Sequence, residues 1–153
     1  MKRSRSLIMP ADVIGAMLDL AGTGYPEETC GVLVGRDDNG VRQVERMEPV
    51  GNQRTDERRR RYLIDADALR RIEAEAAASG LDVIGFYHSH PDHPAVPSAF
   101  DREHAWPWYS YVIVPVMAGE AGALRAWRLQ DDRDAFIEET ISVDSTDARK
   151  ESA

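Results

Sequence analysis

Two histidines at the end of an apolar segment are the residues of this chain best suited to metal chemistry. Residues 81–87 are apolar, β-branched or aromatic, and the run is too short for a helix, so it predicts a buried strand leading into His88, Ser89 and His90. Side chains two apart on a strand point to the same face, which places both imidazoles on one side and turns Ser89 away. Because neutral imidazole nitrogen is a preferred zinc ligand, the pair predicts the start of a zinc site.

A proline-rich stretch follows the histidines. Pro91, Pro94 and Pro97 cannot continue a central strand, so we expect an extended loop. Ser98 then fits the N-cap of a short helix, with Asp101 three residues later as in a capping box. If the loop folds back, Asp101 supplies a third, anionic ligand and leaves the fourth tetrahedral position for water, as in catalytic zinc sites.

This spacing resembles the metal signature of the JAMM/MPN+ metallopeptidases. His88-Ser89-His90, seven further residues, Ser98, two residues and Asp101 match that signature without a gap. Upstream, residues 26–35 read Pro-Glu-Glu-Thr-Cys-Gly-Val-Leu-Val-Gly and are similar to the family's glutamate segment. The resemblance spans roughly residues 7 to 130, and the agreement of two separated motifs makes it specific.

The resemblance implies an activity and a set of roles. Zn²⁺ would bind His88, His90 and Asp101, Glu28 would act as general base, and Ser98 would donate to the oxyanion of the reacting carbonyl. The implied reaction is hydrolysis of an amide bond after the C-terminal Gly-Gly of a ubiquitin-like or sulfur-carrier (ThiS/MoaD-like) protein, with cysteine as one conceivable leaving group. A general small-peptide or cell-wall peptidase and a non-catalytic MPN-type binding scaffold remain alternatives.

Several of these residues have competing interpretations. The Ser98 hydroxyl could instead be occupied in capping the helix, and Asp101 could be only a capping residue. His93 and His104 are rival ligands outside the signature positions, which we take as surface residues or as neighbours of the site. Cys30 invites a cysteine-protease hypothesis, but a small buried side chain on a strand is the expected role.

Composition limits the class of protein. With 153 residues and 42% hydrophobic content, we expect one domain over residues 1–140 and a polar, disordered tail over 141–153. The net charge of −8 argues against a nucleic-acid partner. No run is long enough to span a membrane, no signal peptide is recognisable, and the single cysteine fits a reducing compartment, so we expect a cytoplasmic protein.

The predicted elements form a mixed α/β layer with helices packed on a sheet, and the resemblance implies the MPN fold, similar to cytidine deaminases. A deaminase itself is excluded, because its Pro-Cys-x-x-Cys motif needs two cysteines. Arginine-rich residues 54–61 fall in a polar connection, interpreted as a solvated loop or as a basic lip for an acidic partner. Helices are predicted over residues 10–21, 65–79 and from 98; strands over 29–36, 41–47, 62–65, 81–87, 109–116 and 124–129.

Overall fold

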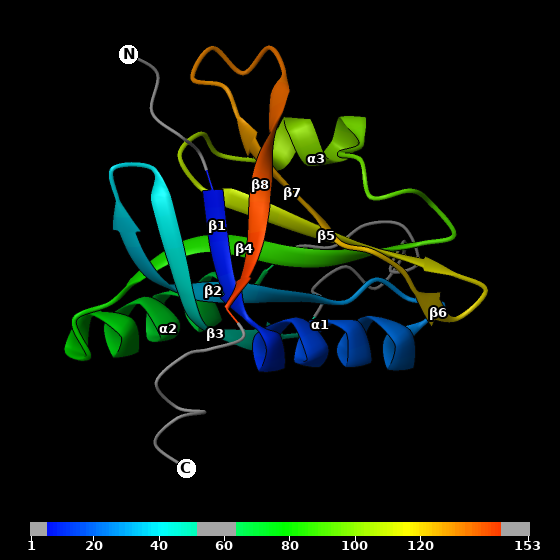
Figure 1. The fold of residues 1–153 in the computed structure, drawn as a ribbon, viewed down its shortest axis with the longest axis horizontal. Helices are drawn as coiled ribbons and strands as arrows, with labels where there is room; N and C mark the ends of the chain where they lie inside the picture. Colours follow the sequence, from blue (N-terminus) through cyan, green and yellow to red (C-terminus); the bar gives the residue numbers. More distant parts are fainter. Residues whose placement is uncertain (1–5, 52–63, 145–153) are drawn as a thin grey trace.

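The computed structural model describes residues 6–51 and 64–144. Within them the chain alternates strands and helices, so the predicted mixed α/β class is confirmed (Figure 1). The elements are β1 (Ser6–Pro10), α1 (Ala11–Gly24), β2 (Cys30–Asp38), β3 (Val41–Val50), α2 (Ala66–Ala78), β4 (Asp82–Pro91), α3 (Ala99–His104), β5 (Ser110–Met117), β6 (Glu120–Ala121), β7 (Arg125–Leu129) and β8 (Phe136–Asp144).

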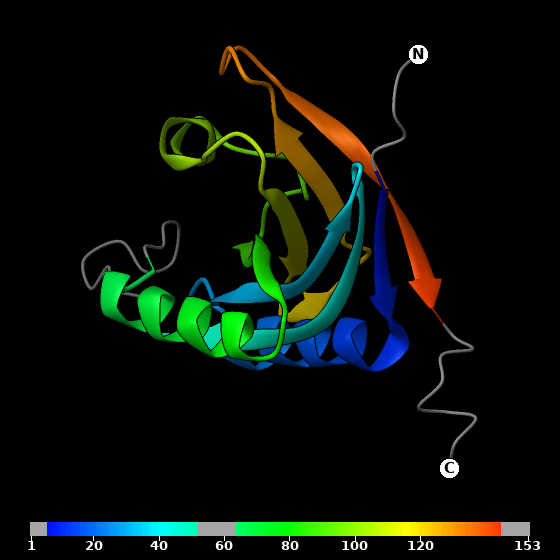
Figure 2. The same cartoon turned by 90° about the vertical axis from the view of Figure 1, so that its left-hand side faces the viewer.

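The strands of the described residues form one sheet that closes on itself. Its order is β4-β2-β3-β1-β8-β7-β5-β6, and β4 also pairs with β5. The sheet of the predicted α/β layer therefore curls into a barrel (Figure 2). The closing pair is parallel and brings the backbones close together: a Cβ on Gly85 of β4 would lie 2.2 Å from the Ser110 carbonyl oxygen of β5. Glycine is thus required where the barrel closes.

Two hydrophobic clusters lie on opposite faces of this sheet. One contains Leu7, Leu33, Val44 and Val112 together with the buried stripe of α1, Val13, Met17 and Ala21. The other packs α2, through Ile72 and Ala76, onto Val32, Val83 and Phe86. The two faces of β2 and β4 are therefore both covered, which explains why these strands read as continuous apolar runs.

Local signals in the sequence mark several element ends. Asn39 and Gly40 have φ values of 54° and 93°, as the two central residues of a type I′ hairpin turn require, and they join the strands that were predicted over 29–36 and 41–47. Gly80, with φ 75°, follows α2, as predicted. Helix α1 continues through Gly24 rather than stopping at residue 21.

The predicted secondary structure was wrong near both ends of the described chain. Strand β1 lies before α1 and was not predicted, and residues 141–144, predicted to be in a disordered tail, belong to β8. These two strands pair in parallel, with Ser6 opposite Thr140 and Pro10 opposite Asp144. Both segments are ordered because they pair with strands far away in the sequence. No local pattern in the polar β8 sequence indicates this pairing.

Other predictions fall outside the described residues or at their border. The arginine-rich segment 54–61 and residues 62 and 63 of the predicted short strand lie outside them, as do residues 145–153. The boundary of the domain at residue 140 is not supported, since β8 crosses it. No helix of the described part of the chain is long and apolar enough to cross a membrane.

Candidate metal centre

The C-terminal half of β4 carries the two histidines. This strand pairs with β2 on one side, where Cys30 faces His88, and with β5 on the other, where His88 and His90 face Ile113 and Pro115. Both imidazoles are buried, with exposed fractions of 1% and 7%, and both point to the same face of β4. The strand predicted from the sequence therefore positions them as expected.

The extended loop begins one residue later than predicted. Pro91 still belongs to β4 and pairs with Val116 of β5. A proline fits here because the paired length of β2 has ended at Cys30 opposite His88, so no neighbouring carbonyl on that side needs the missing N–H. The next residue, Asp92, resumes the contact with β5 by donating its N–H to the Val116 carbonyl at 2.6 Å.

The loop returns the chain to the histidines through α3. Ser98 caps this helix: its Oγ accepts from the Asp101 N–H at 3.0 Å, and its own N–H donates to Asp101 Oδ2 at 2.8 Å. This reciprocal pair is the predicted capping box. It fixes the Asp101 side chain toward β4, where 9% of the residue remains exposed.

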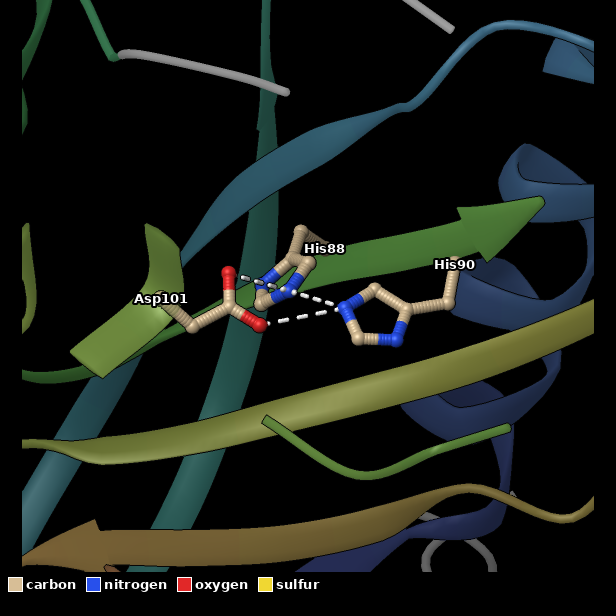
Figure 3. A group of neighbouring side chains, drawn as sticks. All are labelled: His88, His90 and Asp101. Carbon is tan, nitrogen blue, oxygen red and sulfur yellow. Dashed lines mark hydrogen bonds and ion pairs between the residues drawn. The ribbon is translucent and has the colours of Figure 1, made fainter. Parts of the chain in front are cut away.

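Three potential ligand atoms converge between β4 and α3 (Figure 3). His88 Nε2 lies 3.1 Å from His90 Nε2 and 3.3 Å from Asp101 Oδ1, while His90 Nε2 lies 3.1 Å from Asp101 Oδ2. His90 Nδ1 donates to the Pro94 carbonyl at 2.8 Å, which leaves Nε2 as the nitrogen with a lone pair. The lone pairs of these nitrogen and oxygen atoms are thus close together, at a place where a bound cation would stabilise them.

The ionisation states suit metal binding. Complete burial lowers the pKa of His88, so this imidazole is neutral near pH 7. Burial alone would raise the pKa of Asp101, but the interactions with His88 and His90 and the hydrogen bond from the Ser98 N–H outweigh it and hold that pKa well below its usual range. Imidazole nitrogens together with a carboxylate oxygen are the donor set that zinc takes in catalytic sites.

Glu28 comes from a different segment, two residues before the start of β2. The Ser89 N–H donates to the Thr29 carbonyl at 3.0 Å, which extends the β2–β4 ladder by one residue beyond Cys30. Thr29 contacts Ser89 and Tyr87 on one face of the sheet, so Cys30 belongs to the face that carries the histidines. The charge of Glu28 acts on the Cys30 thiol. The carboxylate is buried, with 5% of the residue exposed, whereas neighbouring Glu27 is exposed.

Cys30 does not have the environment of a nucleophile. Burial and, secondarily, the negative charge of Glu28 raise the pKa of the thiol to about 12. Its Sγ donates to the Val50 carbonyl at 3.4 Å, and only 1% of the residue is exposed. A packing role for Cys30 is therefore favoured over the cysteine-protease hypothesis.

The rival histidines lie outside the group of three. His93 is exposed in the loop. His104 donates from Nδ1 to the Phe100 carbonyl at 3.0 Å, and its ring stacks on Phe100 with a centroid separation of 4.0 Å. Among the described residues, only His88, His90 and Asp101 form such a group of potential ligands.

An apolar pocket of about 240 Å³ opens next to Asp101, and the sequence analysis did not predict it. It lies on the face of β4 that carries the histidines, since Phe86 lines it and is two residues from His88. Trp106 lines it, whereas Trp108 stacks on the buried Arg42, with its ring centroid 4.0 Å from the guanidinium carbon. The remaining lining residues are Ile64, Ala66, Leu69, Phe100, Asp101, His104 and Tyr111. Its contributions from α2 and β5 are tertiary contacts that no sequence motif indicates.

Comparison with known proteins places this geometry in a family. Residues 10–130 match the model of the prokaryotic homologs of the JAB domain. A desampylase from Haloferax volcanii is 41% identical over 115 residues, 72% of this chain and 81% of the relative. A CysO-cysteine peptidase from Mycobacterium tuberculosis is 33% identical over 139 residues, 90% of each protein.

A solved structure agrees with both the fold and the sequence match. The solution structure of a Desulfitobacterium hafniense protein superposes with a TM-score of 0.80 and 28% identity, covering 94% of this chain and 96% of that one. The matched segment 10–130 includes the glutamate segment, both histidines, the capping serine and Asp101. This chain belongs to the prokaryotic homologs of the JAB domain, the JAMM-type family that its motifs resemble.

Proposed function

We propose that this chain is a zinc-dependent peptidase that hydrolyses the amide bond after the C-terminal Gly-Gly of a ubiquitin-like or sulfur-carrier protein. The observation that carries this proposal is the convergence of His88, His90 and Asp101 on one point between β4 and α3. The names of two relatives, a desampylase and a CysO-cysteine peptidase, support the substrate class.

The donor spacing fits zinc. Tetrahedral zinc with bonds of about 2.0–2.1 Å separates its ligand atoms by about 3.3 Å. The two Nε2 atoms here are 3.1 Å apart, and each lies 3.1–3.3 Å from one of the two Asp101 carboxylate oxygens. When bound, zinc would supply a Lewis acid and lower the pKa of a coordinated water. The Pro94 carbonyl would keep the His90 ring in the tautomer whose Nε2 can bind the ion.

Glu28 and Ser98 would perform the proton transfer and the charge stabilisation. Glu28 is buried two residues before the start of β2, and its carboxylate would take a proton from the attacking water and return it to the leaving amine. Capping α3 uses a lone pair of the Ser98 oxygen, as acceptor from the Asp101 N–H. Its hydroxyl hydrogen can therefore still donate to the carbonyl oxygen of the substrate, and the two interpretations of Ser98 are compatible.

Two finer inferences accompany the activity. We infer that the closed sheet with its packed helices shares the cytidine-deaminase architecture that the family resemblance implies. We also infer that the enzyme works in the cytoplasm, where a single unpaired cysteine is common and small carrier proteins are made.

The test uses a matched pair of glutamates. Glu28→Gln should abolish hydrolysis while the protein still binds about one zinc per chain, because the carboxamide keeps the shape but cannot accept the proton. Glu27→Gln changes the exposed neighbouring glutamate and should leave both activity and zinc unchanged. The substrate is a ThiS-type carrier extended by cysteine after its Gly-Gly, with cleavage followed by mass spectrometry, beside a set of free dipeptides.

Each outcome decides one part of the proposal. Full activity in Glu28→Gln would refute the assignment of the base. Turnover of the dipeptides but not of the carrier would favour the general peptidase. Zinc binding without turnover of either substrate would favour the binding scaffold.

A further inference from the structure

Thr29, the residue after Glu28, is held by hydrogen bonds from the back of the metal strand. Its Oγ1 shares a short hydrogen bond with Tyr87 Oη and donates to Ser89 Oγ at 3.2 Å. Its backbone N–H donates to the same Ser89 Oγ at 2.9 Å, and its carbonyl accepts from the Ser89 N–H at 3.0 Å. Both partners on β4 are completely buried. We propose that Thr29 is a positioning residue that sets the place of Glu28 relative to His88 and His90.

The pattern of these bonds shows where the ladder between β2 and β4 opens. In a regular antiparallel pair, Thr29 and Ser89 would exchange two backbone hydrogen bonds. Here only the Ser89 N–H makes a backbone bond, and the Thr29 N–H goes to the Ser89 side chain. The serine between the two ligand histidines therefore satisfies a partly buried N–H at the point where the chain leaves the sheet. Glu28 is the first residue beyond that point.

A steric contact with α1 also limits the position of Thr29. A Cβ added to Gly24, the last residue of α1, would lie 2.2 Å from Thr29 Cγ2, so glycine is needed for the threonine methyl to fit. A Cβ on Gly22, one half-turn earlier, would come no closer than 3.7 Å to the Gly119 carbonyl oxygen. The methyl and the hydroxyl of Thr29 are thus both constrained, and β-branching restricts the side chain to few rotamers.

This inference rests on the proposed role of Glu28 as base. A general base must lie within hydrogen-bond reach of the proton it takes, and a displacement of about 1 Å can cost about a hundredfold in rate. Within the described residues, the hydrogen bonds of Thr29 go to Tyr87 and Ser89 and not to a ligand atom of the metal group. Changes at Thr29 should therefore lower kcat without changing zinc content or KM.

The experiment compares variants that keep or remove each contact. Thr29→Val preserves the shape and removes the hydroxyl, and should lower kcat about tenfold or more; Thr29→Ser retains the hydroxyl and should recover most of that loss. Gly24→Ala should also lower kcat by displacing Thr29, whereas Gly22→Ala, in the same helix, should keep the wild-type kcat. Zinc content, KM and thermal midpoint are measured for every variant, and assays run well below the lowest midpoint. If Thr29→Val does not fold, Ser89→Ala removes the bond to the Thr29 N–H and takes its place.

A double substitution separates positioning from general stability. If Thr29 acts through Glu28, adding Thr29→Val to Glu28→Gln should not lower the residual rate further, because the group being positioned is no longer a base. The inference would be overturned if Thr29→Val lowered the residual rate of Glu28→Gln by the same factor by which it lowers the wild-type rate. It would also be overturned if Thr29→Val and wild type had equal kcat. The proposed function fails separately, when Glu28→Gln itself remains active.

Discussion

Cys30 shows how the environment of one residue decides its chemistry. The thiol lies opposite His88 in the β2–β4 ladder, yet burial and the charge of Glu28 raise its pKa to about 12. At pH 8 the thiolate fraction is then about one in ten thousand, and the thiolate is the reactive form. We expect Cys30 in the native protein to resist iodoacetamide at pH 8 and to react fully after denaturation.

Mass spectrometry of the alkylated protein measures this directly. Activity should survive treatment of the native protein, with the same protein in denaturant as the control for reagent quality. Rapid native alkylation with loss of hydrolysis would contradict the assignment and restore the cysteine-protease hypothesis. Glu28→Gln should make the thiol slightly more acidic, because it removes a negative charge that opposes ionisation.

The residues of the metal group could be predicted because their signal is local. His88, His90 and Asp101 lie within one strand, one loop and one capping box, each of which has its own sequence pattern. Glu28 was identified from a second motif, but how close it comes to the histidines in space depends on the register of β2 against β4. The Thr29 contacts and the pocket beside Asp101 join segments far apart in the sequence, so no local sequence pattern predicted them.

At the scale of elements, local chemistry predicted the hairpin and the helices, and pairing between distant segments accounts for what was missed. Strand β8 has a polar sequence because much of it faces solvent, so its pattern resembled a tail. It is ordered by parallel pairing with β1 and antiparallel pairing with β7. The prediction that proline cannot continue a central strand was wrong at Pro91. There β4 pairs only with β5, because its pairing with β2 has already ended.

Two neighbouring glutamates of β8 test how that strand is held. Glu139 is buried and paired with the buried Arg128 of β7, whereas Glu138 pairs with Arg125 at 2.8 Å on the surface. Glu139→Ala should reduce the free energy of unfolding by about 3–5 kcal/mol, because it leaves the Arg128 charge buried without its partner. Glu138→Ala should cost far less, since exposed pairs are screened by solvent.

Urea unfolding of the two variants and wild type checks this difference. Equal losses would mean that the burial of the Arg128–Glu139 pair does not matter for the attachment of β8. A fully stable Glu139→Ala protein would show that this buried ion pair does not hold β8 in place.

At the scale of the whole molecule, closure of the sheet brings the parts of the site together. Strand β4 is held between β2, which leads back to Glu28, and β5, which follows the loop and α3 that deliver Asp101. A metal ion bound by His88, His90 and Asp101 would join β4 to α3 across a proline-rich loop. Metal binding and global stability should therefore be coupled, because the group of ligands exists only in the folded chain.

Removing the metal should lower the thermal midpoint of the whole domain. Zinc at a hundredfold excess over its dissociation constant stabilises the folded state by about 2.7 kcal/mol, which for a chain of this size corresponds to about 5–10 °C. We expect chelator to lower the midpoint of wild type by that amount and zinc to restore it. Asp101→Ala should abolish the response, whereas His93→Ala, which changes an exposed histidine of the same loop outside the group, should keep it. Calorimetry with and without chelator gives the answer: an unchanged wild-type midpoint, or a full zinc response in Asp101→Ala, would show that these three side chains do not bind the ion together.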